Sequence, residues 1–135
     1  MNREIKFRGK QKFGTEWITG DINHIDGEVF IFDRSENAPL NSPDWFEVSP
    51  ETVCQYTGLK DKNGKEVYEG DVLKDVRDDK LFNWLVEWDN SRAGFVIVNI
   101  SLGGYLGCRY PIDSFYYFEF REVIGNIHEN PELLK

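Results

Sequence analysis

The chain has 135 residues, a net charge of −8 and an aromatic content of 15%. A hydrophobic fraction of 40% in a chain of this length excludes a disordered protein and suits one core or two small subdomains. The acidic balance argues against nucleic acid as a partner, and no apolar run approaches the roughly 18 residues of a membrane-spanning helix.

The first predicted strand covers residues 3–8. Its alternation suggests that Ile5 and Phe7 face inward, while Lys6 and Arg8 form a solvated face. A strand lined with Lys and Arg is typical of the edge of a sheet, where charge discourages unwanted pairing.

The rest of the N-terminal half reads as a β-meander. Strands are predicted over 17–22 and 28–32, joined by a two-residue hairpin turn at Asp26-Gly27. Residues 33–45 are too polar and too rich in Pro for regular structure. Ser49-Pro50-Glu51 then predicts a single helical turn with Ser as its N-cap.

The strongest turn signal of the chain is Asn63-Gly64, which favours a type I′ hairpin turn with two positive φ angles. The β-prone triplet Gln55-Tyr56-Thr57 precedes it, and a strand is predicted over 67–76. Five residues are assigned structural roles in this turn and strand motif: Asn63, Gly64, Tyr68, Gly70 and Asp71.

Further strands are predicted around 82–88, 95–100 and 115–124, with a turn at 89–91 and a short helical turn from Pro131. In the first of them, Phe82, Trp84, Val86 and Trp88 share a buried face. Three apolar side chains are predicted on outer faces, as candidates to line a peptide groove or a subunit contact: Leu85, Phe115 and Tyr117.

The sequence shows no cluster of Cys and His residues at the spacing of a metal or catalytic site. Cys54 and Cys108 lie far apart, as do His24 and His128, so neither a metal site nor a catalytic constellation is predicted, and no cofactor is implied. Two isolated thiols without a signal peptide are expected to stay reduced in a cytoplasm.

The pattern of short strands and tight turns predicts an all-β protein. Residues 1–58 are expected to form a β subdomain, and residues 59–135 an SH3-like barrel that ends in a short helical turn.

Several long motifs carry a family resemblance. They are Arg3-Glu4-Ile5-Lys6-Phe7-Arg8, Trp17 with Gly20-Asp21, the run over 56–66, Tyr68-Glu69-Gly70-Asp71, and the closing run over 122–134. In these motifs the chain resembles the YopX family of bacteriophage and prophage proteins. The resemblance implies an all-β protein with a C-terminal SH3-like roll, and it brings no catalytic residues to carry over.

The leading functional hypothesis is a non-enzymatic protein–protein interaction or assembly module that forms a homo-oligomer or binds a phage or host protein. The surplus of aromatic residues and the lack of a catalytic cluster motivate it. The alternatives are an acidic inhibitor of a host nucleic-acid-binding protein, a small hydrolase or nuclease with a carboxylate site, and nucleic-acid binding through the basic residues 1–12.

Overall fold

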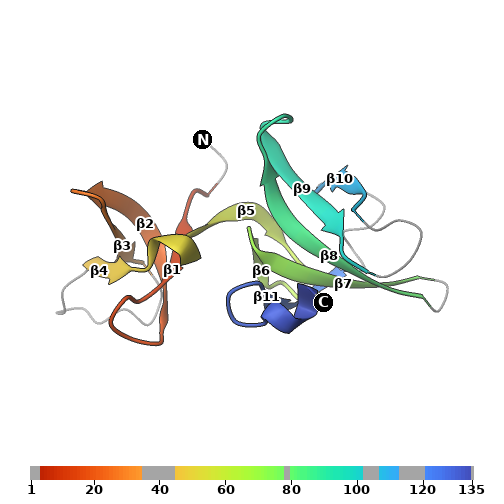
Figure 1. Cartoon of the computed structure of the whole chain (residues 1–135), viewed down its shortest axis with the longest axis horizontal. Helices are drawn as coiled ribbons and strands as arrows, with labels where there is room; N and C mark the ends of the chain where they lie inside the picture. The colour runs from red at the N-terminus through yellow and green to blue at the C-terminus, as the bar shows by residue number, and fades with distance from the viewer. Residues whose placement is uncertain (1–3, 35–44, 78–79, 102–106, 113–120, 135) are drawn as a thin grey trace. The chain divides into compact units, whose positions relative to one another are not determined.

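The described chain consists almost entirely of short β-strands joined by turns (Figure 1). The strands are rich in aromatic and β-branched residues, and Gly, Asn, Asp and Pro lie between them. The structure is a computed structural model that describes residues 4–34, 45–77, 80–101, 107–112 and 121–134. Two 3-10 turns are the only helical segments in those ranges, so the all-β class predicted from the sequence is confirmed. The chain divides into two compact units, Met1–Tyr56 and Thr57–Lys135.

The N-terminal unit is an antiparallel sheet whose first four strands pair in succession. Its strands are β1 (Phe7–Lys10), β2 (Trp17–Ile25), β3 (Glu28–Asp33) and β4 (Trp45–Val48), and the first residues of β5 (Cys54–Lys60) pair with β1. Ile18, Val29, Ile31 and Val48 form its buried core.

The strand β1 does not lie at an edge, because it pairs with both β2 and β5, so the prediction of an edge strand is wrong. Phe7 packs against the core as predicted, but Ile5 is 37% exposed. Lys6 and Arg8 do not form a solvated face. Each cation lies over an aromatic ring, at 5.0 Å from the centroid of Tyr56 and 5.2 Å from that of Trp17 respectively.

The turns of this unit follow local signals. Asp26 and Gly27 have φ angles of 50° and 83°, and Ile25 pairs with Glu28, which confirms the two-residue hairpin. A single 3-10 turn, η1 (Pro50–Thr52), follows Ser49 as predicted, although the Ser side chain makes no capping bond. The predicted loop over 33–45 overlaps β4 at Trp45, and residues 35–44 lie outside the described residues.

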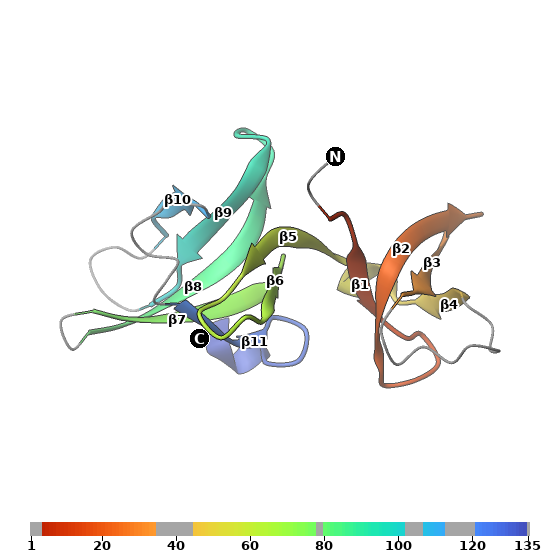
Figure 2. The ribbon, with the colours of Figure 1, turned by 180° about the vertical axis from the view of Figure 1, so that it is seen from behind.

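The C-terminal unit contains the remaining strands. They are the end of β5, β6 (Glu66–Tyr68), β7 (Asp71–Arg77), β8 (Lys80–Asp89), β9 (Gly94–Asn99), β10 (Arg109–Pro111) and β11 (Arg121–Asn126), followed by η2 (Pro131–Leu134). Five of them form a sheet in the order β10-β9-β8-β7-β11, and η2 packs beside β11 (Figure 2). Among the described strands this sheet does not close into a barrel, so the SH3-like barrel stays a prediction.

A cluster of apolar side chains forms the core of this unit: Val67, Leu73, Trp84, Val86, Ile97 and Ile112. The predicted buried face of β8 is therefore confirmed for Trp84 and Val86. Phe82 packs against the cluster, but Trp88 is 44% exposed, so the prediction fails at that position.

The single strand predicted over 67–76 is wrong, because the chain turns between β6 and β7. Gly70 has a φ of 86° and donates its N–H to the Val86 carbonyl at 2.8 Å. The Asp71 carboxylate accepts the Tyr68 N–H at 2.8 Å, inside the unit. The motif Tyr68, Gly70 and Asp71 thus holds a tight turn between two strands.

The turn at Asn63-Gly64 also differs from the prediction. Only Gly64 has a positive φ, 82°, and its N–H bonds the Asp61 carbonyl at 3.0 Å, so the four-residue turn begins at Asp61. The type I′ prediction fails because the Asp61 side chain competes for the backbone. Its Oδ1 accepts the N–H groups of Asn63 at 2.9 Å and Lys65 at 2.8 Å.

The other oxygen of Asp61 links this turn to the far end of the unit. Oδ2 accepts the N–H of Val123 on β11 at 2.9 Å, and the Lys62 N–H reaches the Arg121 carbonyl at 3.0 Å. Burial raises the pKa of the Asp61 carboxyl, but three backbone donors and Lys65 outweigh burial, so this pKa lies below its ordinary value.

A buried ion pair crosses the same region. Arg121 on β11 is 1% exposed, and its Nε lies 3.9 Å from Oδ2 of Asp75 on β7. The guanidinium also lies 5.4 Å from the ring centroid of Trp84. Arg121 is therefore an interior residue.

We expect Asp61→Ala to lower the free energy of unfolding by about 2–3 kcal/mol, because it leaves three backbone donors without their charged acceptor. Asp61→Asn should lose less, since it keeps one acceptor oxygen. Urea denaturation followed by tryptophan fluorescence measures both. Asp26→Asn is the matched control, because it changes another hairpin aspartate that is exposed, and it should leave stability unchanged. Equal stability of Asp61→Ala and the unchanged chain would contradict this account.

The lowered pKa of Asp61 also predicts a pH dependence. The unfolded chain takes up this proton first as the pH falls, so the stabilisation is complete above the unfolded pKa of about 3.9. It is lost as the pH falls through the lower pKa of the folded state. The difference in unfolding free energy between the unchanged chain and Asp61→Asn should therefore shrink between about pH 5 and pH 2. A difference that stays constant over this range would refute the assignment.

Candidate functional site

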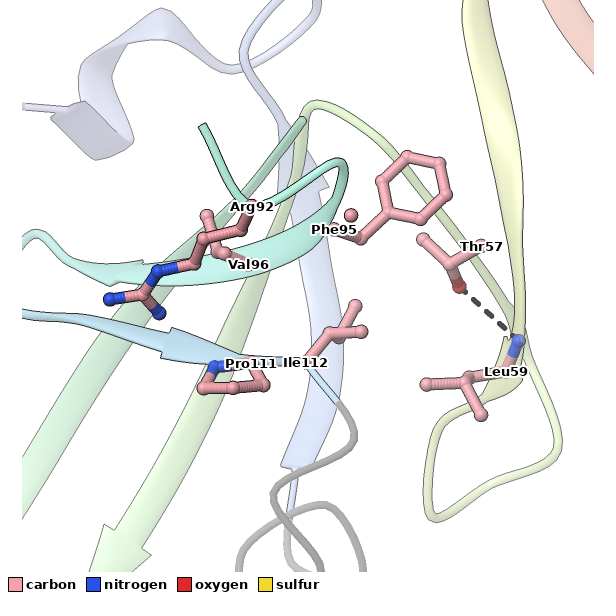
Figure 3. Close-up of a pocket in the computed structure, with 8 residues that line it drawn as sticks. Thr57, Leu59, Arg92, Phe95, Val96, Pro111 and Ile112 are labelled. Atoms are coloured by element: carbon pink, nitrogen blue, oxygen red, sulfur yellow. Dashed lines mark hydrogen bonds between the residues drawn. The ribbon is translucent and has the colours of Figure 1, made fainter. Parts of the chain in front are cut away.

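A groove in the C-terminal unit is the candidate site (Figure 3). Its volume is about 400 Å³. Eight residues from three separate stretches of the chain line it: Thr57, Leu59, Arg92, Gly94, Phe95, Val96, Pro111 and Ile112.

One wall of the groove is the end of β5. Gly58 has a φ of 90°, a backbone conformation that residues with a Cβ rarely adopt, and it bends the strand between Thr57 and Leu59. The Thr57 hydroxyl donates to the Val67 carbonyl at 2.7 Å and accepts the Leu59 N–H at 3.2 Å. In Figure 3 both Thr57 and Leu59 face Phe95 and Ile112 across the groove.

The opposite wall begins at the turn between β8 and β9. The Asp89 carboxylate accepts the N–H and hydroxyl of Ser91 at 2.9 and 2.6 Å and the N–H of Arg92 at 3.3 Å. The Ser91 hydroxyl is the main cause that lowers the pKa of Asp89, and backbone donors and Arg109 add to it against the effect of burial. Ala93 follows with a φ of 50°. This turn therefore holds Arg92 in place at the groove.

Two contacts position the apolar residues Phe95 and Ile112 of the groove. The ring of Phe95 packs edge-on against Trp88, with centroids 5.1 Å apart, and the Trp88 indole donates to Asn90 at 2.8 Å. The Ile112 N–H bonds the Phe95 carbonyl at 3.2 Å, which ties the end of β10 to β9. A ring contact thus positions Phe95, and a backbone hydrogen bond positions Ile112.

The described lining is suited to binding an apolar group. Apart from the Thr57 hydroxyl and the Arg92 guanidinium, the described residues of the lining are apolar or glycine, and none of them carries a carboxylate, imidazole or thiol. Such a surface can bury an apolar side chain and orient one polar partner.

The buried carboxylates of this unit lie elsewhere and serve the fold. Asp61 and Asp71 accept backbone N–H groups, and Asp75 lies beside Arg121. Within the described ranges, no three His, Cys, Asp or Glu residues are grouped as a metal site would require. No helix in the described part of the chain is long and apolar enough to cross a membrane.

Of the three predicted binding residues, only Leu85 belongs to the described part of the chain, and it does not line the groove. Leu85 is only 9% exposed and lies inside the five-stranded sheet, opposite Val72 on β7 and Val98 on β9, so its outer position was wrongly predicted. Phe115 and Tyr117 lie outside the described residues. The groove residues Leu59, Phe95 and Ile112 were missed, because they lie in distant stretches of the chain and no local pattern brings them together.

Comparisons with known proteins agree with the sequence resemblance. Residues 3–135 match the family described as YopX protein. No curated protein matches the chain. Among solved structures, the crystal structure of protein EF1440 from Enterococcus faecalis is similar, with a TM-score of 0.58 and 24% identity over 99% of this chain and 100% of that one. At this identity the likeness shows the fold alone. Because the family match covers nearly the whole sequence, the chain belongs to the YopX family.

Proposed function

We propose that this chain is a non-enzymatic protein-binding module, and that the groove of its C-terminal unit receives an extended segment of a partner protein. The observation that carries the proposal is the groove lining, in which the described residues offer apolar surface and one cation but no catalytic group. A volume of about 400 Å³ suits one or two side chains and not a folded surface.

The strand order supports an SH3-like roll as the scaffold for this groove. Strands β7 to β10 pair in succession, and β11 returns to pair with β7, the first of them. The last strand, β11, thus lies beside β7, the first strand of the five-stranded sheet, which supports a roll built from this sheet. We therefore propose the roll for the C-terminal unit, with the groove beside β9 and β10.

We also propose that the chain forms a homo-oligomer, although binding in the groove does not depend on it. Exposed apolar side chains are spread over both units, as at Phe13, Trp45, Leu81 and Trp88. Single apolar side chains of this kind are normal on monomeric proteins. Light scattering of the unchanged chain measures its mass in solution, which is 15.8 kDa for a monomer. A larger mass for the unchanged chain, together with the monomer mass for Leu59→Ser, would identify a second copy as the occupant of the groove.

The test is selection of short random peptides by display against the full chain. Peptides enriched on the unchanged chain should perturb the amide NMR signals of Leu59, Phe95 and Ile112 and leave those of the N-terminal unit unchanged. Leu59→Ser should weaken their binding about tenfold, because it removes part of the apolar contact.

Leu81→Ser is the matched control, since Leu81 is a 56% exposed leucine of the same unit outside the groove, and it should bind peptides as the unchanged chain does. The amide spectrum of each variant shows whether it is folded. If no peptide is enriched, or if the enriched peptides perturb only signals outside the groove, the proposed function is wrong.

A further inference from the structure

Arg92 is the one charged residue among the described residues that line the groove. Its guanidinium makes no ion pair or hydrogen bond with the residues that the structure describes. Arg109 on β10 differs, since its Nη1 lies 3.1 Å from Oε2 of Glu87 and 3.9 Å from Oδ2 of Asp89. Among the described residues, the groove therefore presents a cation that has no acidic partner, on a backbone that the Asp89 turn holds in place.

The backbone on both sides of the groove is poorly suited to pair with an added strand. On β5, the Leu59 N–H is already taken by the Thr57 hydroxyl. On β10, the ladder directs Ile112 N–H toward β9, so the neighbouring nitrogen of Pro111 points away from β9, and it carries no hydrogen. An occupant is consequently recognised through side chains more than through β-augmentation.

Together these features define the chemistry of the occupant. Resting on the proposed function, we propose that the groove selects a segment in which an apolar side chain is followed or preceded by Asp or Glu. The apolar side chain packs between Leu59, Phe95 and Ile112, and the carboxylate pairs with Arg92. A guanidinium is suited to this role because its planar donors can bind both carboxylate oxygens.

The net charge of −8 repels an acidic partner over long range and slows its approach, whereas Arg92 attracts the carboxylate at short range. The contact with Arg92 decides which segment is preferred, because the long-range repulsion is similar for segments that differ at only one residue. A segment with Lys or Arg at the same place would face Arg92 with like charge, and a neutral one would gain no pairing.

The test uses the peptides enriched by display on the full chain. Those that contact the groove should be enriched in Asp or Glu next to an apolar residue. An enriched peptide is then synthesised with Glu, Gln or Lys at that one position and measured by fluorescence anisotropy. The Glu form should bind the unchanged chain about three- to fivefold more tightly than the Gln form, as an exposed ion pair allows, and the Lys form should bind more weakly than either.

Arg92→Gln should bind the Glu and Gln forms equally, and Arg92→Glu should prefer the Lys form. Arg34→Gln is the matched control: it removes the same charge from the N-terminal unit, where Arg34 pairs with Asp21, and should keep the preference for Glu. Groove binding with no preference for Glu, or a preference that survives in Arg92→Gln, overturns this inference and leaves the proposed function intact. If no peptide binds the groove, both are overturned.

Discussion

The carboxylate of Asp61 is the contact on which the C-terminal unit depends. One oxygen accepts two N–H groups of its own hairpin turn, and the other accepts the Val123 N–H on β11, which is 62 positions away in the sequence. A charged acceptor with three backbone donors is stronger than neutral bonds of the same number. Asp61 therefore fixes the shape of the β5–β6 hairpin and its place against β11 at the same time.

The groove is a consequence of that attachment. Leu59 lies two residues before Asp61, so the position of the hairpin sets where one wall stands. A second aspartate acts similarly on the other wall, where Asp89 bonds the turn that carries Arg92. One carboxylate is buried and the other lies in an exposed turn, but both use the local preference of Asp to bond the backbone just beyond it. Two turns built by side chains thus position the wall residues that we propose to bind a partner.

Local signals in the sequence predicted much of the fold. The hairpin at Asp26-Gly27 is encoded by two adjacent residues, and the buried face of β8 by alternation at Trp84 and Val86, so both could be read directly. The turn at Asn63-Gly64 was placed correctly but given the wrong geometry, because the Asp61 side chain outcompeted the preference of the Asn-Gly pair.

Features that depend on contacts between distant strands could not be predicted. Arg121 is interior because β11 pairs with β7 directly opposite Asp75, a contact that no local pattern of the sequence encodes. The site was missed for the same reason, since Leu59 on β5, Phe95 on β9 and Ile112 after β10 meet only in the folded unit. Gly58 was the nearest local hint, because a glycine within a strand often marks a bend.

Amide hydrogen exchange, followed residue by residue by NMR, tests the central role of Asp61 most directly. In Asp61→Ala, exchange at Lys65 and Val123 should accelerate strongly, and Leu59 at the groove wall should lose protection with them. Ile31 in the core of the N-terminal unit should exchange as before, which provides an internal reference. Unchanged protection at Val123 and Leu59 in a variant that has lost the carboxylate would show that other contacts hold the hairpin and would contradict the account.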